Sequence, residues 1–405
     1  MGNMVALILA GGKGKRMDML CYLRPKPALP FAGNFRVIDF SLSNCIHSRV
    51  ADIAVLVDYQ RAYLGDYLNQ WSSANHGGTR LDILPPSAGS YAGTADAVHQ
   101  NLDYLEKHDA DIVLVLAGDH IYKMDYRRMI AFHQAMKADV TVGVVSVPAE
   151  ETQRFGTVTV DAAGRIREFL EKSPKPLSGL ASMGIYVFNQ DLLAKRLRED
   201  AGDPASEHDF GYAILPRMVK TDRVFAYRYE GYWQDIGTTE AYYQANMELL
   251  VNQPRFSLNG DWAILGESDA LTVPIENREG SIVNSLISPG CIVNGRVENS
   301  ILSPGVHVAE QAIVRNSIIM DHVSVGYHSV VDRCILDEGG TIGKFCYAGF
   351  GAENIPGNDG ITLLGKDVTV PDFTAIGRRC KVLHRVGPAE FHTQLVSSGT
   401  VLAPR

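Results

Sequence analysis

Three glycines and three basic residues stand together near the start of the chain, directly after an apolar run. The run reads "LILA", and residues 11–16 after it read "GGKGKR". Glycines let the backbone approach a phosphate closely, and consecutive N–H groups that point one way form a nest for an anion. The segment matches neither the P-loop nor the dinucleotide-binding pattern. It is therefore interpreted as a phosphate cradle of another kind or as a surface turn.

Two carboxylates follow apolar stretches in distant parts of the chain. Asp119 stands in "VLAGDHIY" and Asp235 in "GYWQDIGT". Each alone is explained by a turn or a helix cap, but together they would suit Mg²⁺, which binds through one or two carboxylates plus substrate phosphates. The spacing does not show whether they meet. Lys26 lies between Pro25 and Pro27, which would hold its backbone rigidly.

Two further segments have both a structural and a chemical interpretation. Glu171 and Lys172 in "FLEKSP" read as a solvated charge pair on an extended chain. Thr94 in "GTADAV" is placed to cap a helix, and the beginning of a helix is equally a place for a base or phosphate contact.

The elements that must position these residues alternate between strands and helices over the first 250 residues. Short apolar runs favour buried strands, and the segments between them have helical periodicity. This alternation predicts an α/β fold, with a mainly parallel sheet and helices on both faces, in which ligands bind at the carboxyl ends of the strands. The expected strands cover 5–10, 53–57, 112–117, 140–147 and 185–188, and the expected helices cover 39–48, 59–70, 94–108 and 126–136.

The last part of the chain has a different rhythm. "NSLI", "NSIL", "NSII" and a degenerate "RCIL" place Ser285, Ser300, Ser317 and Cys334 at steps of 15, 17 and 17 residues, with turn signals and aliphatic positions between them. Such periodicity is typical of a parallel β-helix, in which Gly or Asn occupies corners of unusual φ. We therefore expect an α/β domain over 1–250, a linker and first coil over 251–280, and a β-helix over 281–405. An ordinary β-sandwich is the alternative.

Composition excludes several classes of protein. A net charge of −8 gives no support to nucleic-acid binding. The six cysteines form no CxxC pair, which favours reduced thiols. No apolar run approaches the length of a membrane span, and the N-terminus lacks a signal-peptide pattern. We expect a cytoplasmic protein without a membrane partner.

At this point the residues resemble a known family, that of bacterial ADP-glucose pyrophosphorylases (glucose-1-phosphate adenylyltransferases). The resemblance covers the whole chain and rests on "LILAGGKGKRM", "RPKPALPFAGNFRVIDFSLSNC", "GTADAVHQNL", "LAGDHIYKMDY", "FGTVTVD", "FLEKSP", "ASMGIYVF", "HDFGYAILP" and "GYWQDIGTTEAYYQANMELL". It implies a Rossmann-like nucleotidyltransferase domain joined to a left-handed parallel β-helix. It also implies a homotetramer that makes ADP-glucose for glycogen from ATP and glucose 1-phosphate with Mg²⁺, under control of an anionic metabolite effector.

The resemblance assigns roles to individual positions. The nucleotide would be held by Gly11, Gly12, Gly14, Gln60, Gly93 and Thr94, and the metal by Asp119 and Asp235. The catalytic set would be Arg16, Lys26, Asp119, Lys172 and Asp235. The glucose 1-phosphate pocket would contain Gly156, Glu171, Lys172, Ser182, Tyr186, Asp209, Phe210 and Trp233.

Other interpretations of the sequence stay open. A related transferase could use UTP or dTTP, a catalytically silent subunit could regulate a partner, and the β-helix could carry an acyltransferase. Leu23, Ala92, Gln234 and Lys13 depart from the best-known enteric version of the family, and Leu23 stands where that version has a lysine implicated in activator binding. A basic cluster near the C-terminus could receive an anionic effector or form a solvated strand face; it consists of Arg378, Arg379, Lys381, His384 and Arg385.

Overall fold

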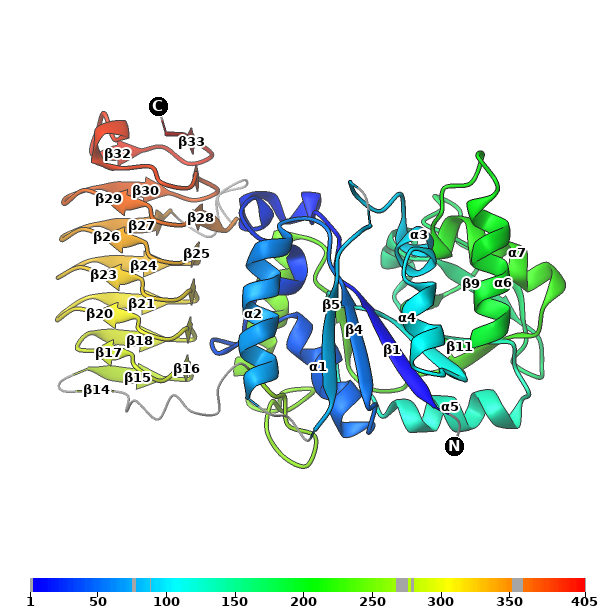
Figure 1. Cartoon of the computed structure of the whole chain (residues 1–405). Helices are drawn as coiled ribbons and strands as arrows, with labels where there is room; N and C mark the ends of the chain where they lie inside the picture. The colour runs from blue at the N-terminus through cyan, green and yellow to red at the C-terminus, as the bar shows by residue number, and fades with distance from the viewer. Residues whose placement is uncertain are drawn as a thin grey trace.

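The computed structural model describes residues 3–74, 78–87, 89–266, 276–277, 280–351 and 360–404. Figure 1 shows two parts side by side: an α/β part that contains the N-terminus, and a stack of short strands that ends at the C-terminus. The segment expected to hold the linker and first coil, 251–280, lies partly outside the described residues. We call the stack of short strands that ends at the C-terminus the β-helix.

A nine-stranded sheet forms the centre of the α/β part. The strands β5, β4, β1 and β6 are parallel neighbours. The sequence predicted β1, β4 and β6 but not β5. Beyond β6 the sheet is mixed, because β11 runs antiparallel to both β6 and β8, while β12 is again parallel to β8. The strands are β1 (Met4–Leu9), β4 (Asp52–Leu56), β5 (Arg80–Leu84), β6 (Ile112–Ala117), β8 (Val140–Ser146), β9 (Thr157–Val160), β10 (Ile166–Leu170), β11 (Leu180–Asn189) and β12 (Val224–Arg228).

Helices cover both faces of this sheet. Alternate residues of β1 enter two separate apolar clusters: Val5 and Leu7 pack on one face, Ala6 and Ile8 on the other. This is the period of two expected for a strand that is buried on both sides. The helices are α1 (Ile38–His47), α2 (Arg61–Ser73), α3 (Thr94–His99), α4 (Leu102–Lys107), α5 (Tyr126–Ala135), α6 (Gln190–Ala201), α7 (Leu215–Thr221) and α8 (Thr239–Met247).

The prediction of one continuous helix over residues 94–108 is wrong. Residues 94–108 form two helices, α3 and α4, instead of one. At the break, the side-chain amide of Asn101 donates to the carbonyl of Ala97 at 2.8 Å and to the hydroxyl of Tyr91 at 3.1 Å. A side chain that bonds the backbone in this way competes with the helical pattern.

Short elements complete the α/β part. Two antiparallel pairs lie outside the large sheet, β2 with β3 and β7 with β13. Several short 3-10 helices, and one π-helical turn, connect the longer elements. Their bounds are β2 (Pro30–Phe31), β3 (Phe35–Arg36), β7 (His120–Tyr122), β13 (Trp233–Asp235), η1 (Lys15–Cys21), η2 (Lys26–Ala28), η3 (Ala149–Arg154), η4 (Phe210–Ile214) and η5 (Glu248–Leu250).

The β-helix consists of three parallel sheets whose strands stack coil upon coil (Figure 1). Aliphatic side chains from all three sheets form one internal cluster. One sheet contains β14 (Glu276–Asn277), β17 (Ile292–Val293), β20 (His307–Val308), β23 (Ser324–Val325), β26 (Thr341–Ile342) and β29 (Thr369–Val370). The second contains β15 (Ser281–Val283), β18 (Arg296–Glu298), β21 (Ile313–Arg315), β24 (Val330–Asp332), β27 (Tyr347–Phe350), β30 (Ala375–Gly377) and β32 (Leu395–Val396). The third contains β16 (Leu286–Ile287), β19 (Ile301–Leu302), β22 (Ile318–Ile319), β25 (Cys334–Leu336), β28 (Thr362–Leu364), β31 (Lys381–Val382) and β33 (Val401–Leu402), and η6 (Pro388–Glu390) precedes β32.

The repeated Asn-Ser pair has a physical explanation in this architecture. Asn284, Asn299 and Asn316 all have positive φ, between 43° and 49°, as expected for corner residues. Each following serine hydroxyl accepts the backbone N–H of the equivalent residue one coil later: Ser300 Oγ, for example, accepts from the N–H of Ser317 at 3.1 Å. The repeat thus turns the chain and ties neighbouring coils together.

The two parts share an apolar cluster. In it, Met17, Leu29 and Phe31 of the α/β part pack with four residues of the β-helix. These are Ile318, Met320, Ile335 and Leu363. The hydroxyl of Tyr243 in α8 donates to the carbonyl of Asn316 at 2.7 Å. The β-helix therefore packs directly against the segment that follows the glycine-rich loop.

Candidate active site

A cleft of about 450 Å³ opens at the carboxyl ends of β1 and β6. This is the edge at which ligands bind in sheets of this kind. Most residues singled out from the sequence line it, although they come from distant parts of the chain. They are Gly11, Gly12, Arg16, Lys26, Gly93, Thr94, Asp119, Gly156, Glu171, Lys172, Ser182, Tyr186, Asp209, Phe210 and Asp235.

The glycine-rich loop joins β1 to η1 at one end of the cleft. A Cβ on Gly11 would stand 3.1 Å from the Cβ of Asp58, whereas a Cβ on Gly12 would meet nothing within 4 Å. The backbone at Gly12 is therefore open to a ligand. Arg16 at the beginning of η1 lines the same cleft. The loop has the composition and the position of an anion-binding nest.

The two carboxylates are brought together by a short antiparallel strand pair, β7 and β13. Asp119 follows β6 and precedes β7, and β13 pairs antiparallel with β7 so that Asp235 stands opposite His120. Lys26 joins them: its Nζ lies 3.0 Å from Oδ2 of Asp119 and 2.8 Å from Oδ1 of Asp235. The side chain of Arg154 adds a second cation, with Nη2 3.0 Å from Oδ2 of Asp235.

These charges shift one another's pKa values. Burial alone would raise the pKa of Asp119, but the neighbouring Lys26 ammonium and His120 outweigh it and lower the pKa below its ordinary value. The pKa of Asp235 is lowered in the same way by Lys26, against burial. Burial lowers the pKa of Lys26, and the two carboxylates more than reverse this, so that its pKa is raised. The centre is a charged lysine held between two ionised carboxylates.

The donor set fits a divalent cation. One ligand atom each from Asp119, His120 and Asp235 lie within 4.8 Å of one another. Carboxylate oxygens are the ligands that Mg²⁺ prefers, and it keeps sites open for water and substrate phosphates. The ammonium of Lys26 already occupies the space between both carboxylates. The site therefore attracts positive charge by its own composition.

The far end of the cleft is built around Glu171. Its Oε1 lies 3.1 Å from Nζ of Lys172, and Gly156 and Gly211 leave room for its carboxylate, since a Cβ on either would overlap it. Burial raises the pKa of Glu171, although Lys172 opposes this. Lys172 has a φ of 41°, so the chain turns there and the expected extended conformation is wrong.

Thr94 and Asp209 form a polar bridge across the cleft wall. The hydroxyl of Thr94 donates to Oδ2 of Asp209 at 2.8 Å and accepts the N–H of Phe210 at 3.0 Å. Oδ1 of Asp209 accepts the N–H groups of Gly211 and Tyr212, which caps the turn η4. Both residues thus have structural partners besides facing the cleft, and Thr94 does not cap its own helix, α3.

Three residues singled out from the sequence do not line the cleft. Gly14 precedes η1 with a φ of 60°, and a Cβ there would stand 2.9 Å from Sγ of Cys21. Gln60 is exposed at the beginning of α2, where its amide donates to the carbonyl of Tyr22. Trp233 stands behind the wall, with its ring 5.1 Å from that of His120 and 5.2 Å from that of Phe155.

Sequence reasoning missed two polar residues of the centre. His120 stood in the quoted "GDHIY", and its Nε2 lies 3.5 Å from Oδ1 of Asp119. Arg154 directly precedes Phe155, which begins the motif "FGTVTVD". The adjacency of Arg154 to that motif was the signal that could have found it.

The C-terminal basic cluster is not a single solvated face. Arg378 is 1% exposed, and its Nη2 lies 3.0 Å from Oδ2 of Asp332. Lys381 instead reaches the α/β part and pairs with Asp18, and a ring nitrogen of His384 lies 2.9 Å from the carbonyl of Met19. Members of the cluster serve the interior of the β-helix and the contact between the two parts.

Within the described ranges, no helix has the length and apolar composition needed to cross a membrane.

Two family models match the chain. Residues 5–252 match the nucleotidyl transferase family, and residues 270–354 match the GlmU-like C-terminal hexapeptide family. The second match agrees with the three parallel stacks of strands, which are those of a left-handed β-helix.

Curated relatives resemble the chain over nearly its whole length. Proteins called glucose-1-phosphate adenylyltransferase from Thermomicrobium roseum and Thermotoga maritima are 42% and 38% identical to it over 422 aligned positions. These alignments cover 100% of this chain and 98% and 100% of the relatives. The protein of that name from Desulfitobacterium hafniense DCB-2 is 40% identical over 92% of this chain and 96% of its own. The chain belongs to the glucose-1-phosphate adenylyltransferases of the nucleotidyl transferase family.

Proposed function

We propose that this protein transfers the adenylyl group of ATP to α-D-glucose 1-phosphate and releases ADP-glucose and pyrophosphate. The observation that carries the proposal is that one cleft holds the glycine-rich loop with Arg16, the carboxylate pair Asp119 and Asp235, and the Glu171–Lys172 pair. A loop for phosphates, a cation site and a second polar pocket are the three parts that such a transfer requires. The relatives, which bear the name of this enzyme, support the same reaction.

The chain's own residues would act by position and charge. A phosphate oxygen of glucose 1-phosphate attacks the α-phosphorus of ATP in line, the new P–O bond forms, and the bond to pyrophosphate breaks. The nucleophile is already an anion, so no general base is needed. The obstacle is repulsion between two polyanions, which preorganised cations reduce. Arg16 and the loop N–H groups would hold the departing pyrophosphate, and Lys172 would hold the sugar phosphate.

A divalent cation belongs to this chemistry, and we propose Mg²⁺ held by Asp119 and Asp235. When bound, it would neutralise charge on the phosphates of the nucleotide. Lys26 and Arg154, which pair with these carboxylates, would keep them ionised and oriented. Loss of one contact of this class lowers a rate by about 10²- to 10³-fold.

The decisive experiment measures pyrophosphate release with Mg²⁺ and glucose 1-phosphate while ATP, UTP, dTTP and GTP are offered separately. The wild type is compared with Asp119→Ala and with Asp82→Ala, a carboxylate of β5 that accepts the hydroxyl of Tyr104 outside the cleft. A strong preference for ATP that disappears only in Asp119→Ala supports the proposal. Pyrophosphate release with UTP or dTTP in place of ATP contradicts it. The absence of release with every nucleotide, even after phosphorylated metabolites are added, contradicts it as well.

From the similarity to these relatives, we also propose that the protein is a cytoplasmic homotetramer. It would supply ADP-glucose for glycogen synthesis and respond to an anionic metabolite. In this proposal residues 1–250 catalyse the reaction, 251–280 connect, and 281–405 serve assembly and regulation. Mass photometry would measure the oligomeric state. Activity assays with phosphorylated sugars and carboxylic acids would identify an effector. A monomer that no such compound activates would contradict these proposals.

A further inference from the structure

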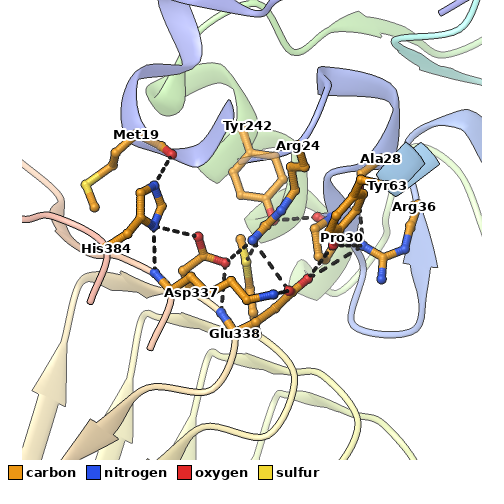
Figure 2. Close-up of polar contacts among 12 residues, drawn as sticks. Met19, Arg24, Ala28, Pro30, Arg36, Tyr63, Tyr242, Asp337, Glu338 and His384 are labelled. Atoms are coloured by element: carbon orange, nitrogen blue, oxygen red, sulfur yellow. Dashed lines mark hydrogen bonds and ion pairs between the residues drawn. The ribbon is translucent and has the colours of Figure 1, made fainter. Parts of the chain in front are cut away.

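Two acidic residues of the β-helix lie at the centre of the contact between the two parts. Asp337 and Glu338 directly follow β25 and face Arg24 and Arg36 of the α/β part (Figure 2). Figure 2 also shows that Tyr63 and His384 lie around this group. All the ion pairs of the group join residues distant in the sequence, so we call it the junction network.

Asp337 anchors Arg24. Nη2 of Arg24 lies 2.5 Å from Oδ1 of Asp337, and both side chains are 1% exposed. Glu338 supports the same guanidinium at 3.6 Å. Burial would lower the pKa of Arg24, but the two carboxylates raise it above its ordinary value. Arg24 is thus a buried cation whose position depends on charge supplied by the β-helix.

Glu338 anchors Arg36 and, through it, the chain on the other side of Lys26. Nη1 of Arg36 lies 3.7 Å from Oε1 of Glu338 and donates to the carbonyl of Ala28 at 2.8 Å. Glu338 also accepts the hydroxyl of Tyr63 at 3.1 Å and pairs with Lys366 of the β-helix at 2.9 Å. Its position is therefore fixed from several sides.

Lys26 stands between these two anchored points. It begins the turn η2 (Lys26–Ala28), in which the carbonyl of Pro25 accepts the N–H of Ala28 at 2.9 Å. Arg24 lies directly before Pro25, and Ala28 ends the turn. Both prolines fix φ, so a displacement at Arg24 or Ala28 moves the turn as a unit. Its one long side chain ends between Asp119 and Asp235.

We propose that Asp337 and Glu338 are positioning residues for the transfer reaction: by holding Arg24 and Arg36, they fix the turn that presents Lys26 to the two carboxylates of the active centre. The β-helix then contributes to catalysis without touching substrate. This inference rests on the proposed function for its kinetic part only. If the role were merely structural, the same contacts would only hold the two domains together. Their loss would then have no effect on catalysis that depends on Lys26.

A double-mutant cycle separates the two roles. We expect Asp337→Asn to lower kcat by roughly ten- to a hundredfold, the size of effect that a small misplacement of a catalytic group produces. In a Lys26→Ala background the same change is expected to lower kcat less than twofold, because its effect passes through the absent side chain. Asp337→Glu, which retains the charge, is expected to recover part of the lost turnover.

The matched control is Asp332→Asn. Asp332 is a buried carboxylate of the β-helix that pairs with Arg315 and Arg378 and accepts the side-chain amide of Asn316, all within that domain. Its loss is expected to lower the melting temperature as Asp337→Asn does, with kcat unchanged. If Asp332→Asn lowers kcat to the same extent, or if Asp337→Asn has equal effects in both backgrounds, the positioning role is wrong.

A second readout does not depend on turnover. Mn²⁺ binding to the full-length protein without substrates can be measured by calorimetry or electron paramagnetic resonance. Lys26 competes with a cation for both carboxylates, so loosening its turn by Asp337→Asn is expected to tighten Mn²⁺ binding severalfold, and to do so only when Lys26 is present. Unchanged Mn²⁺ affinity overturns the inference. A wild type that makes no ADP-glucose would contradict the proposed function, while the Mn²⁺ titration would still test the junction network.

Discussion

Nζ of Lys26 lies 2.8 Å from Oδ1 of Asp235, although 209 positions separate the two residues in the sequence. Asp119 lies 3.0 Å from the same ammonium, so the lysine sits between both carboxylates of the candidate metal site. An ammonium and a divalent cation cannot both occupy this space with full effect. Binding of a metal ion would therefore have to displace Lys26 from the carboxylates or share them with it.

The first prediction concerns the removal of Lys26. Lys26→Ala leaves two carboxylates in a buried site without their main cation, so Mn²⁺ is expected to bind the free protein more tightly. Turnover is expected to fall by about 10²- to 10³-fold, because a preorganised cation is lost. Calorimetry and a pyrophosphate assay measure the two effects. Lys195→Ala, an exposed lysine of α6, is the control, and weaker Mn²⁺ binding by Lys26→Ala would contradict the competition.

Some residues of this active centre could be placed from the sequence, and others could not. Asp119 and the glycine-rich loop each follow a buried strand, and a rule of sheet topology places such residues at one edge. Asp235 follows no strand of the large sheet. It reaches the site through the β7–β13 pair, whose partners lie more than a hundred residues apart. Local patterns contain no information about that pairing.

The same distinction holds for the rest of the fold. The Asn-Ser repeat predicted the β-helix because its corners and its serine ladder are local features repeated in three successive coils. The break between α3 and α4 was missed because it depends on Asn101 finding the hydroxyl of Tyr91. The junction network was missed entirely, since Arg24 and Asp337 are 313 positions apart and each alone reads as an ordinary surface charge.

A second prediction tests the sugar side of the cleft. Lys172→Ala is expected to raise KM for glucose 1-phosphate by about ten- to a hundredfold, with a much smaller change in KM for ATP, because a charge-assisted bond to one substrate is lost. Lys175→Ala removes an exposed lysine three residues later that does not line the cleft, and it is expected to leave both constants unchanged. Steady-state kinetics with each substrate varied decide this. Equal effects of Lys172→Ala on both KM values would mean that this lysine does not distinguish the substrates.

A third prediction compares two glycines. A Cβ on Gly93 would overlap the carbonyl oxygen of His208 and stand 2.8 Å from that of Glu207, so Gly93→Ala must push two segments apart and disturb the bond between Thr94 and Asp209. Both the melting temperature and activity are expected to fall. Gly65→Ala lies inside α2, where a Cβ meets nothing within 4 Å, and is expected to stabilise the protein by up to about 1 kcal/mol. Thermal unfolding of both variants measures this, and a neutral Gly93→Ala would show that the cleft wall adapts.

The fourth prediction is a pH dependence of stability that arises from Glu338. Burial would raise the pKa of this carboxyl, but Arg24, Arg36 and Lys366 lower it from an ordinary 4.5 to about 2. Because the folded-state pKa is the lower one, the stabilisation is present in full above about pH 4.5 and is lost as pH falls toward 2. Its size is of the order of 3 kcal/mol. In urea unfolding, the difference in free energy between the wild type and Glu338→Gln is therefore expected to shrink steadily below about pH 4.5.

Glu310→Gln supplies the control for that titration, because Glu310 is an exposed glutamate of the same β-helix. Its difference from the wild type should stay near zero over the whole range, since its exposed side chain is in contact with water in the folded chain as in the unfolded chain. A difference for Glu338→Gln that stays constant with pH would mean that the carboxylate is not held ionised by its cations. Arg24 and Arg36 would then need another source of negative charge to remain buried beside the turn of Lys26, and the junction network as described would be wrong.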